Sequence, residues 1–272
     1  MKSKKMALIA LLSVNLFSCV QNKFVEFPLI IHEGYGPFSM GFAGMRTVMD
    51  SEGSPWKNTY PKISKFPDSL TDIKYNYFET NIYQALYQDY LSGNITKEFY
   101  EEFQKETNWT PDTINLSPIP IKTKIAYAYG KDLEGNFKIA IDANNNLDLS
   151  DDKLFTPPIN ITIMNSIDRS KFDSIAQAHA INVSFEVFSH NKIVPVSVPL
   201  FIYSFGGGNG FMSNFAQYAT TQYKGEKIAV SSSGFTNLSY NDISVALIND
   251  LKVGEKLKRE NPLNPRAKNL VH

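Results

Sequence analysis

Two short stretches of the chain carry the hydrophobic period of an α-helix. Residues 79–91 (ETNIYQALYQDYL) place apolar side chains three or four positions apart, so that they share one helix face. In residues 96–106, Phe99 and Phe103 lie one turn apart on a common face. A Ser-Gly-Asn sequence ends the first stretch, and Pro111 follows the second. We predict a short helical hairpin.

Beyond Pro118 the pattern changes to alternating apolar and polar positions, rich in β-branched residues, which is typical of strands. Turn dipeptides such as His190-Asn191 and Lys224-Gly225 join neighbouring runs, as in β-hairpins. The pattern predicts an α+β protein of predominantly antiparallel β-sheet, with the short helical hairpin at one end. The predicted strands cover residues 121–130, 137–141, 160–164, 181–189, 192–203, 216–224 and 227–233.

The two ends of the chain lack a sustained period. Residues 20–67 are rich in Gly, Pro and aromatic residues, which indicates a tether followed by loops and short strands. The residues from 256 onward are rich in Lys, Arg, Asn and Pro. We therefore expect a tether with loops over residues 19–67, a β-rich domain over residues 68–255 and a flexible tail over residues 256–272.

The N-terminus has the features of a targeting segment. Three lysines precede an apolar run over residues 6–17, which is too short to span a bilayer as a helix. The sequence Leu-Phe-Ser-Cys that ends at Cys19 resembles the lipobox of bacterial lipoproteins, whose cysteine is acylated after cleavage. An ordinary secretory signal or a buried helix would explain the apolar run, but not the cysteine. The resemblance implies a signal peptide over residues 1–18, lipidation of Cys19 and a location at the outer membrane, facing the periplasm.

The composition excludes several classes of protein. Cys19 is the only cysteine, so a lipidated chain has no thiol for disulfides, zinc ligation or CxxC redox chemistry. The signal peptide contains three of the 27 Lys and Arg residues and none of the 27 Asp and Glu residues, which leaves 27 − 3 = 24 basic against 27 acidic residues. With no basic cluster, we expect no nucleic-acid partner. The lipid is then the expected attachment to the membrane.

Residues 141–152 (IDANNNLDLSDD) contain four carboxylates and three carboxamides but no Lys or Arg. Such crowding costs free energy through repulsion unless the groups face water or share a cation. Counted from Asp142, oxygen-bearing side chains occupy positions 1, 3, 5 and 7, and hard oxygen donors of this kind suit Ca²⁺. The predicted ligands are Asp142, Asn144, Asn146 and Asp148, the last through its side chain or its main-chain carbonyl, with Asp151 or Asp152 completing the shell.

This stretch, which we call the Asp/Asn loop, departs from an EF-hand in three respects. Leu147 stands where an EF-hand has Gly, Lys153 stands where it has a bidentate Glu, and a strand-like segment precedes it. The alternative is a solvated turn whose Asp and Asn side chains bond their own backbone. If calcium binds, Asp142→Ala should abolish the calcium dependence of stability and barely disturb the calcium-free protein, because it relieves repulsion.

The region from Tyr60 to Pro157 resembles the N-terminal region of thioredoxin-like, TlpA-type lipoproteins of the Gram-negative envelope. The resemblance rests on NIYQALYQDYLSGNIT, NWTPDT and KIAIDANNNLDLSDDKLF. In addition, DLKVGEKL near Leu251 resembles the run that often precedes the redoxin domain of those proteins. That domain carries a CxxC motif, which this chain lacks. The resemblance implies an accessory component that works with a separate envelope redoxin and has no redox residue of its own.

The sequence contains no motif of a common catalytic centre. The glycine-rich residues 203–210 lack the Lys-Ser/Thr of a P-loop, the histidines lack zinc-site spacing, and no Ser occupies a G-x-S-x-G elbow. We expect a non-catalytic envelope lipoprotein module, stabilised by calcium, that binds or positions a partner. The alternatives are the accessory component of a thiol–disulfide system and a hydrolase whose carboxylates the sequence does not pair.

Overall fold

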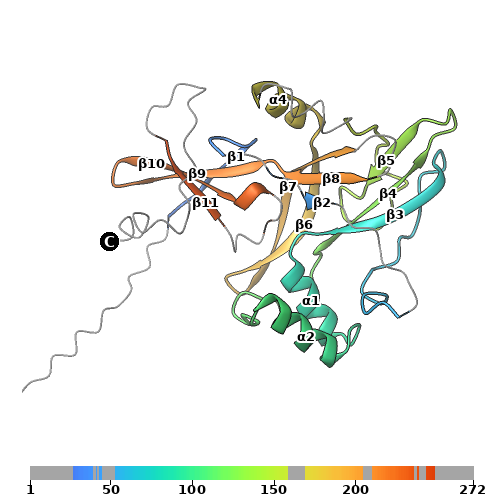
Figure 1. Cartoon of the computed structure of the whole chain (residues 1–272), viewed down its shortest axis with the longest axis horizontal. Helices are drawn as coiled ribbons and strands as arrows, with labels where there is room; N and C mark the ends of the chain where they lie inside the picture. The colour runs from blue at the N-terminus through green and yellow to red at the C-terminus, as the bar shows by residue number, and fades with distance from the viewer. Residues whose placement is uncertain are drawn as a thin grey trace, which may run out of the picture.

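The computed structural model describes residues 27–38, 41, 43–44, 53–158, 169–204, 210–235, 238 and 243–248. The signal peptide, Cys19, the strand predicted over residues 160–164 and the C-terminal tail lie outside the described residues. Within them, the strands form three antiparallel sheets accompanied by few helices (Figure 1), which confirms the α+β class in outline. None of the helices in the described ranges has the length and apolar character needed to cross a membrane.

Six of the strands follow the predicted runs, which are rich in β-branched and aromatic residues that favour strands. They are β4 (Lys124–Lys131), β5 (Phe137–Ile141), β6 (Ile181–Ser189), β7 (Lys192–Ser204), β9 (Gln217–Tyr223) and β10 (Glu226–Ser232). Two prolines are tolerated in β7 because, over residues 192–199, this strand pairs with β6 alone.

Five further strands complete the sheets. Two fall in the N-terminal region for which short strands were predicted, and they pair with strands from the other end of the chain, β1 with β9 and β2 with β8. The other three were not predicted. The five are β1 (Ile30–Glu33), β2 (Ala43–Gly44), β3 (Thr71–Glu79), β8 (Phe211–Phe215) and β11 (Ile243–Leu247).

The predicted helical hairpin is present as α1 (Ile82–Leu91) and α2 (Lys97–Thr107). Asn81 and Thr96 cap the two helices through side-chain oxygens that accept backbone N–H groups of the first turns. Another helix, α4 (Arg169–His179), and a short 3₁₀ turn at Ser233–Phe235 were not predicted.

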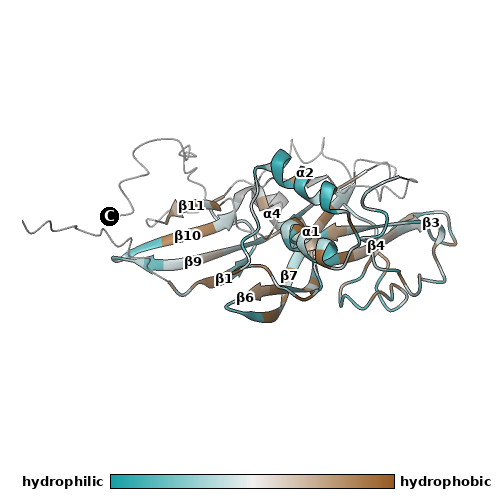
Figure 2. Ribbon diagram, turned by 90° about the horizontal axis from the view of Figure 1, so that it is seen from below, coloured by the Kyte–Doolittle hydropathy of each residue, from teal (hydrophilic) through white to brown (hydrophobic). Residues whose placement is uncertain are grey.

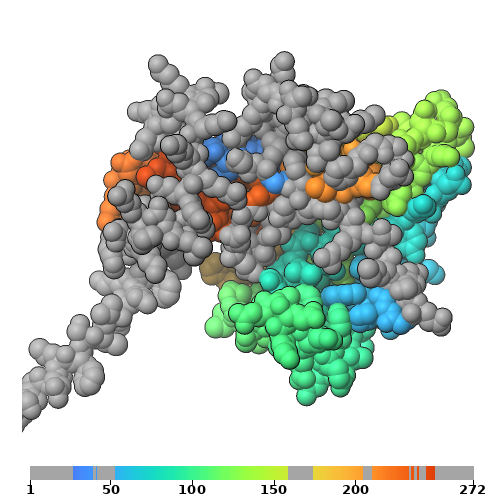
Figure 3. All heavy atoms as spheres, viewed as in Figure 1, coloured from blue at the N-terminus to red at the C-terminus, as the bar shows by residue number. Residues whose placement is uncertain are grey.

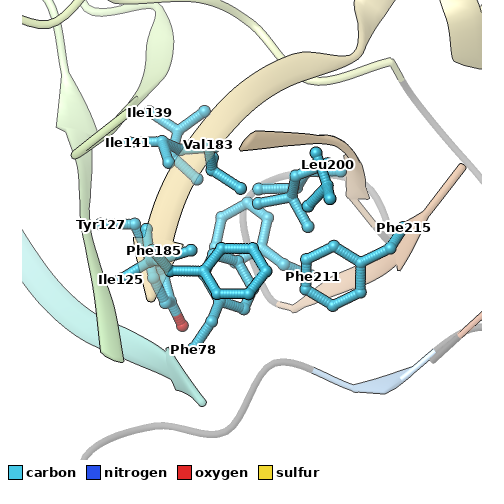
Figure 4. Packing of buried hydrophobic residues seen from close by; sticks show 12 residues of the cluster. Phe78, Ile125, Tyr127, Ile139, Ile141, Val183, Phe185, Leu200, Phe211 and Phe215 are labelled. Carbon is cyan, nitrogen blue, oxygen red and sulfur yellow. The ribbon is translucent and has the colours of Figure 1, made fainter. Parts of the chain in front are cut away.

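The strands form three sheets, ordered β3-β4-β5, β2-β8-β7-β6 and β1-β9-β10-β11, which we call the β4 sheet, the β7 sheet and the β9 sheet. The β4 and β7 sheets pack face to face over the largest apolar cluster (Figure 4). Ile125 and Tyr127 of β4 and Leu200 and Ile202 of β7 point into it, and all four are at most 2% exposed. The residues between them point to the opposite faces, as the pleat requires.

Both sheets are also covered on their second faces. The other side of the β7 sheet, with Phe201 and Tyr203, packs against α4, residues 35–38 and the inner face of the β9 sheet. The other side of the β4 sheet, with Ala126 and Ala128, packs under residues 60–70 and the Asp/Asn loop. Burial on both faces explains why β4 is continuously apolar over IAYAY.

The hairpin α1–α2 forms a lobe of its own, next to the segment that begins at residue 53 (Figure 3). Tyr90 and Tyr100 stack across the two helices with ring centroids 4.2 Å apart, and Trp56 closes the cluster. A buried ion pair fastens the lobe to the β4 sheet: Lys124 Nζ lies 2.7 Å from Asp89 Oδ2, and both side chains are 6% exposed.

Candidate functional site

The Asp/Asn loop connects β5 to a segment that returns beside the same strand. Ile139 and Phe155 exchange both backbone hydrogen bonds, at 2.9 and 3.0 Å, and so close the base of the loop. Leu149, which is fully buried, fixes the middle of the loop in the core beneath the β4 sheet. The strand-like segment predicted before the loop is therefore present as β5, and extended chain at Phe155 pairs with it after the loop.

The backbone of the loop turns sharply at two residues in the left-handed region, Asn145 at φ 55° and Leu147 at φ 63°. Leu147 is the sixth residue counted from Asp142, the position at which an EF-hand uses Gly for its sharp turn. The missing Gly therefore does not change the local path of the chain. Leu147 adopts the strained conformation because its side chain packs into the core and its carbonyl accepts hydrogen bonds from Ser64 N and Oγ, both at 2.7 Å.

Asp142 organises this turn from a fully buried position. Its Oδ1 accepts the N–H of Asn146 and its Oδ2 accepts the N–H of Leu147, both at 2.9 Å. None of the ion pairs among the described residues includes this carboxylate. These hydrogen bonds oppose the expectation that Asp142→Ala would barely disturb the calcium-free protein, because the side chain holds the loop backbone in place.

Three of the predicted ligands meet at the outer side of the loop. Asn144 Nδ2 and Asn146 Nδ2 both donate to Asp151 Oδ2, at 3.2 and 3.0 Å. Alternate side chains of the loop thus converge, with one carboxylate and two carboxamides. In the described residues no three His, Cys, Asp or Glu side chains gather in a way that could hold a metal ion. The donor set must therefore include the carboxamide oxygens if an ion binds.

The Asp148 carboxylate bonds the following turn, while the Asp148 N–H donates to Asn146 Oδ1 at 2.7 Å. Asp148 Oδ1 accepts both the backbone N–H of Ser150, at 2.9 Å, and the Ser150 hydroxyl, at 2.6 Å. These hydrogen bonds, together with the nearby Lys65 ammonium, hold the pKa of the Asp148 carboxyl below its usual range. Its side chain caps the following turn, which leaves the main-chain carbonyl as the alternative ligand.

Asp152 lies on the inner side of the loop and is incompletely satisfied. Its Oδ1 accepts the N–H of Ala143 at 3.1 Å, whereas its Oδ2 is buried without a hydrogen-bond partner. Burial raises the pKa of Asp152 to about 6, and the charges of Asp142 and Asp151 add to this effect, against the hydrogen bond from Ala143, which lowers the pKa. A buried oxygen without a donor is the kind of group that a cation would satisfy.

Two segments distant in sequence support the loop, and sequence patterns gave no signal for either. Lys65 O accepts the N–H of Leu149 at 2.9 Å, so residues 64–65 run beside the loop. Lys122 Nζ donates to Asn145 O at 2.7 Å. The Lys122 ammonium thus bonds a carbonyl instead of a carboxylate, and no ion pair in the described part of the chain includes an acidic group of the loop.

Residues 145–147 of the loop also form one wall of a pocket of about 670 Å³. The other walls are the C-terminal end of α1, residues 58–61 and residues 120–124. The lining is rich in carboxamides, with Tyr60 as its aromatic surface. A rigid loop would give this pocket a fixed wall.

Comparisons with known proteins give no further guide to the site. A scan against protein-family models finds no match, and neither a search of curated proteins nor a search of solved structures finds one.

Proposed function

We propose that the protein is a non-catalytic, lipid-anchored envelope module in which calcium at the Asp/Asn loop fixes the wall of a partner-binding pocket. The observation that carries this proposal is the burial of two carboxylates of the loop, those of Asp142 and Asp152. Among the described residues, the fully buried Asp142 has no cationic partner and the buried Asp152 Oδ2 has no hydrogen-bond partner. Carboxylates in such surroundings are stable when they are paired or coordinate a metal.

The residues of the loop fit a hard cation. Carboxylate and carboxamide oxygens each offer two lone pairs, so an oxygen that accepts an N–H can also ligate an ion. Asp142, Asn144, Asn146 and either Asp151 or Asp152 would hold calcium, with Asp148 contributing through its carbonyl, so that two carboxylate side chains at most would ligate the ion. Bound calcium would supply the positive charge that the loop lacks. It would thereby stabilise the folded state and, through residues 145–147, the pocket wall.

The proposed partner of this pocket is an envelope redoxin or another envelope protein. The resemblance to TlpA-type lipoproteins supports this choice, because those proteins join a similar segment to a redoxin domain within one chain. The carboxamide-rich lining supports recognition by hydrogen bonding.

Calcium binding is expected to release a proton from Asp152 near pH 6. With a pKa of about 6, above the ordinary value of Asp, the carboxyl is largely protonated in the calcium-free fold below that pH, and a ligand must be deprotonated. The calcium affinity should therefore fall up to tenfold per pH unit below about 6 and level off above 7. Calorimetric titrations in buffers of different ionisation heat measure the number of protons released.

The same pKa sets the pH dependence of stability without calcium. The pKa of Asp152 is higher in the folded state than in the unfolded state. Its favourable contribution to the free energy of unfolding is therefore fully present below about pH 4 and is lost as the pH rises through about 6. Asp152→Asn should remove both this loss and the proton release, whereas Asp132→Asn, in the turn between β4 and β5, should leave both intact. A calcium affinity that does not change between pH 5 and 7 would contradict the role of Asp152.

Lipid anchoring is expected to depend on Cys19 alone. Cys19→Ser should move the protein from the membrane fraction to the soluble fraction, or leave an uncleaved precursor, because two or more acyl chains are needed for stable attachment. Mass spectrometry of the N-terminal peptide measures the acylation directly. Ser18→Ala, which keeps a small residue before the cysteine, is the matched control and should fractionate as the unaltered chain does. A free thiol at Cys19 in membrane-bound protein would refute the anchor.

A further inference from the structure

The β9 sheet has two faces of different character. Strand registers assign each residue to a face, because side chains alternate along a strand. On the inner face, Tyr218, Ala229 and Ala246 pack into the core shared with the β7 sheet. The opposite, outer face belongs to none of the hydrophobic clusters formed by the described residues.

Two rows of mainly apolar side chains cross this outer face from β1 to β11. In register, one row consists of Ile31, Ala219, Val230 and Val245, and the next consists of Thr221, Ile228 and Leu247. Leu29, one residue before β1, has the same alternation as Ile31 and lies at the open end of the second row. The charged residues of the face, Glu33 and Glu226, lie at opposite ends of the sheet, outside both rows. Figure 2 shows hydrophobic segments in β1 and, on the other side of β9, in the neighbouring strands β10 and β11.

The ends of these rows are open to solvent. Leu29 is 53% exposed, Ile31 is 54% exposed and Val245 is 60% exposed. An antiparallel sheet with one packed face ordinarily places polar residues on the other. Here apolar side chains are exposed at both edges of the face, with the buried Ala219 and Thr221 of β9 between them. Exposed apolar side chains gathered on one face mark an interaction surface.

The size of the face decides against a second copy of the chain as its occupant. Four strands about 4.8 Å apart and about 20 Å long cover roughly 400 Å². Stable protein–protein interfaces cover about 800 Å² on each partner. A face of this size can instead make a weak contact with a surface to which the chain is already attached, since tethering makes the contact intramolecular.

The proposed lipid anchor provides that attachment, and the inference rests on it. Cys19 precedes Phe27 by 27 − 19 = 8 residues, which span at most about 29 Å when extended. The ring of Phe27 packs on Tyr223, at a centroid distance of 5.2 Å, at the end of the apolar rows. Aromatic rings at the edge of an apolar surface suit the boundary between headgroups and acyl chains.

We propose that the outer face of the β9 sheet rests on the bilayer that holds the anchor, with Leu29, Ile31 and Val245 in the headgroup–acyl boundary. The contact orients the module on the membrane. The β4 sheet and the helical lobe lie at a distance from the β9 sheet (Figure 1), so the contact would leave the pocket and the Asp/Asn loop away from the strands that rest on the bilayer.

The test couples the chain from Cys19 to His272 through its single thiol to a maleimide phospholipid in phosphatidylcholine vesicles. This coupling does not depend on cellular acylation, so failure of the anchor and failure of the membrane contact give different results. Val245→Trp places a fluorophore on the outer face. Leu133→Trp, at a position 79% exposed in the turn between β4 and β5, is the matched control. The signal of the native Trp56 and Trp109 is subtracted using the unaltered chain.

Brominated lipid is expected to quench Val245→Trp at least twofold more than Leu133→Trp, because bromine quenches only at short range. Adding Ile31→Lys should remove this difference, with an unchanged melting temperature showing that the fold persists. Equal quenching at the two positions would overturn the proposal. A dimer that forms in solution without vesicles, is detected by sedimentation and dissociates in the Ile31→Lys variant would also overturn the proposal. It would assign the face to a second copy of the chain.

Discussion

Asp142→Ala is expected to lower the free energy of unfolding of the calcium-free protein by about 2–4 kcal/mol and to abolish its stabilisation by calcium. The first effect follows because Leu147 N–H loses its acceptor and Asn146 N–H loses a charge-assisted bond. The second follows because position 1 of the loop loses its ligand. Urea unfolding with calcium and with chelator measures both effects.

For the unaltered chain, calcium at a hundredfold excess over Kd should add about 2.7 kcal/mol. For a domain of this size, this corresponds to a rise in melting temperature of roughly 5–10 °C. Asp142→Asn keeps one acceptor oxygen, so it should retain more of the calcium-free stability than Asp142→Ala while binding calcium more weakly. This variant keeps the test informative if the Ala variant fails to fold.

The matched control is Asp132→Ala. Asp132 also accepts two backbone N–H groups, those of Glu134 and Asn136, but in a turn outside the loop. It should lose some stability and keep the full calcium effect. Superimposable melting curves of the unaltered chain with calcium and with chelator would show that the loop is a metal-free turn.

Lys124→Met is expected to destabilise the protein by about 3–5 kcal/mol, because it leaves the buried Asp89 carboxylate without its cation. The Lys124 ammonium also donates to Thr59 O and lies over the ring of Tyr60, 5.2 Å from its centroid. Loss of this group should loosen α1 and residues 59–60 together, and these form two walls of the pocket. Hydrogen exchange of α1 amides and urea unfolding measure the effect.

The double variant Asp89→Leu, Lys124→Met should recover much of the lost stability, since replacing both charges removes the uncompensated carboxylate. Lys97→Met is the matched control. Its ion pair with Glu101 is exposed, at 66% and 61% of the two side chains, and should contribute less than 1 kcal/mol. If Lys124→Met and Lys97→Met unfold at the same urea concentration, the buried pair does not hold the lobe in place.

Some of the helices and strands that were not predicted nevertheless had a signal in the sequence. Phe172, Ile175, Ala176 and His179 stand at helical spacing, so α4 could have been predicted from its period. β11 alternates in ISVAL, but it is only five residues long and gives a weak signal. β3, over TDIKYNYFE, is polar in its first half, and it becomes a strand because β4 supplies its partner.

The candidate site likewise has features that could be predicted from the sequence and features that could not. The sequence alone showed the residue types of the loop, its strand flank and its departures from an EF-hand. It did not give the left-handed Leu147, which is held by Ser64 from another part of the chain. Nor did it give the unpartnered Asp152 oxygen, because burial depends on how the loop packs under residues 60–70.

The sequence by itself determined what depends on neighbouring residues: the hairpin α1–α2, six strands and the concentration of oxygen donors at residues 141–152. Helical and strand periods and repulsion between adjacent charges act over a few positions, so they can be recognised in a single chain. Only the tertiary structure decided which strands pair across long separations, such as β1 with β9. The tertiary structure also decided the burial of Asp142, the pairing of Lys124 with Asp89, and which face of the β9 sheet the described residues leave uncovered. All three features depend on contacts between segments that lie far apart in the sequence.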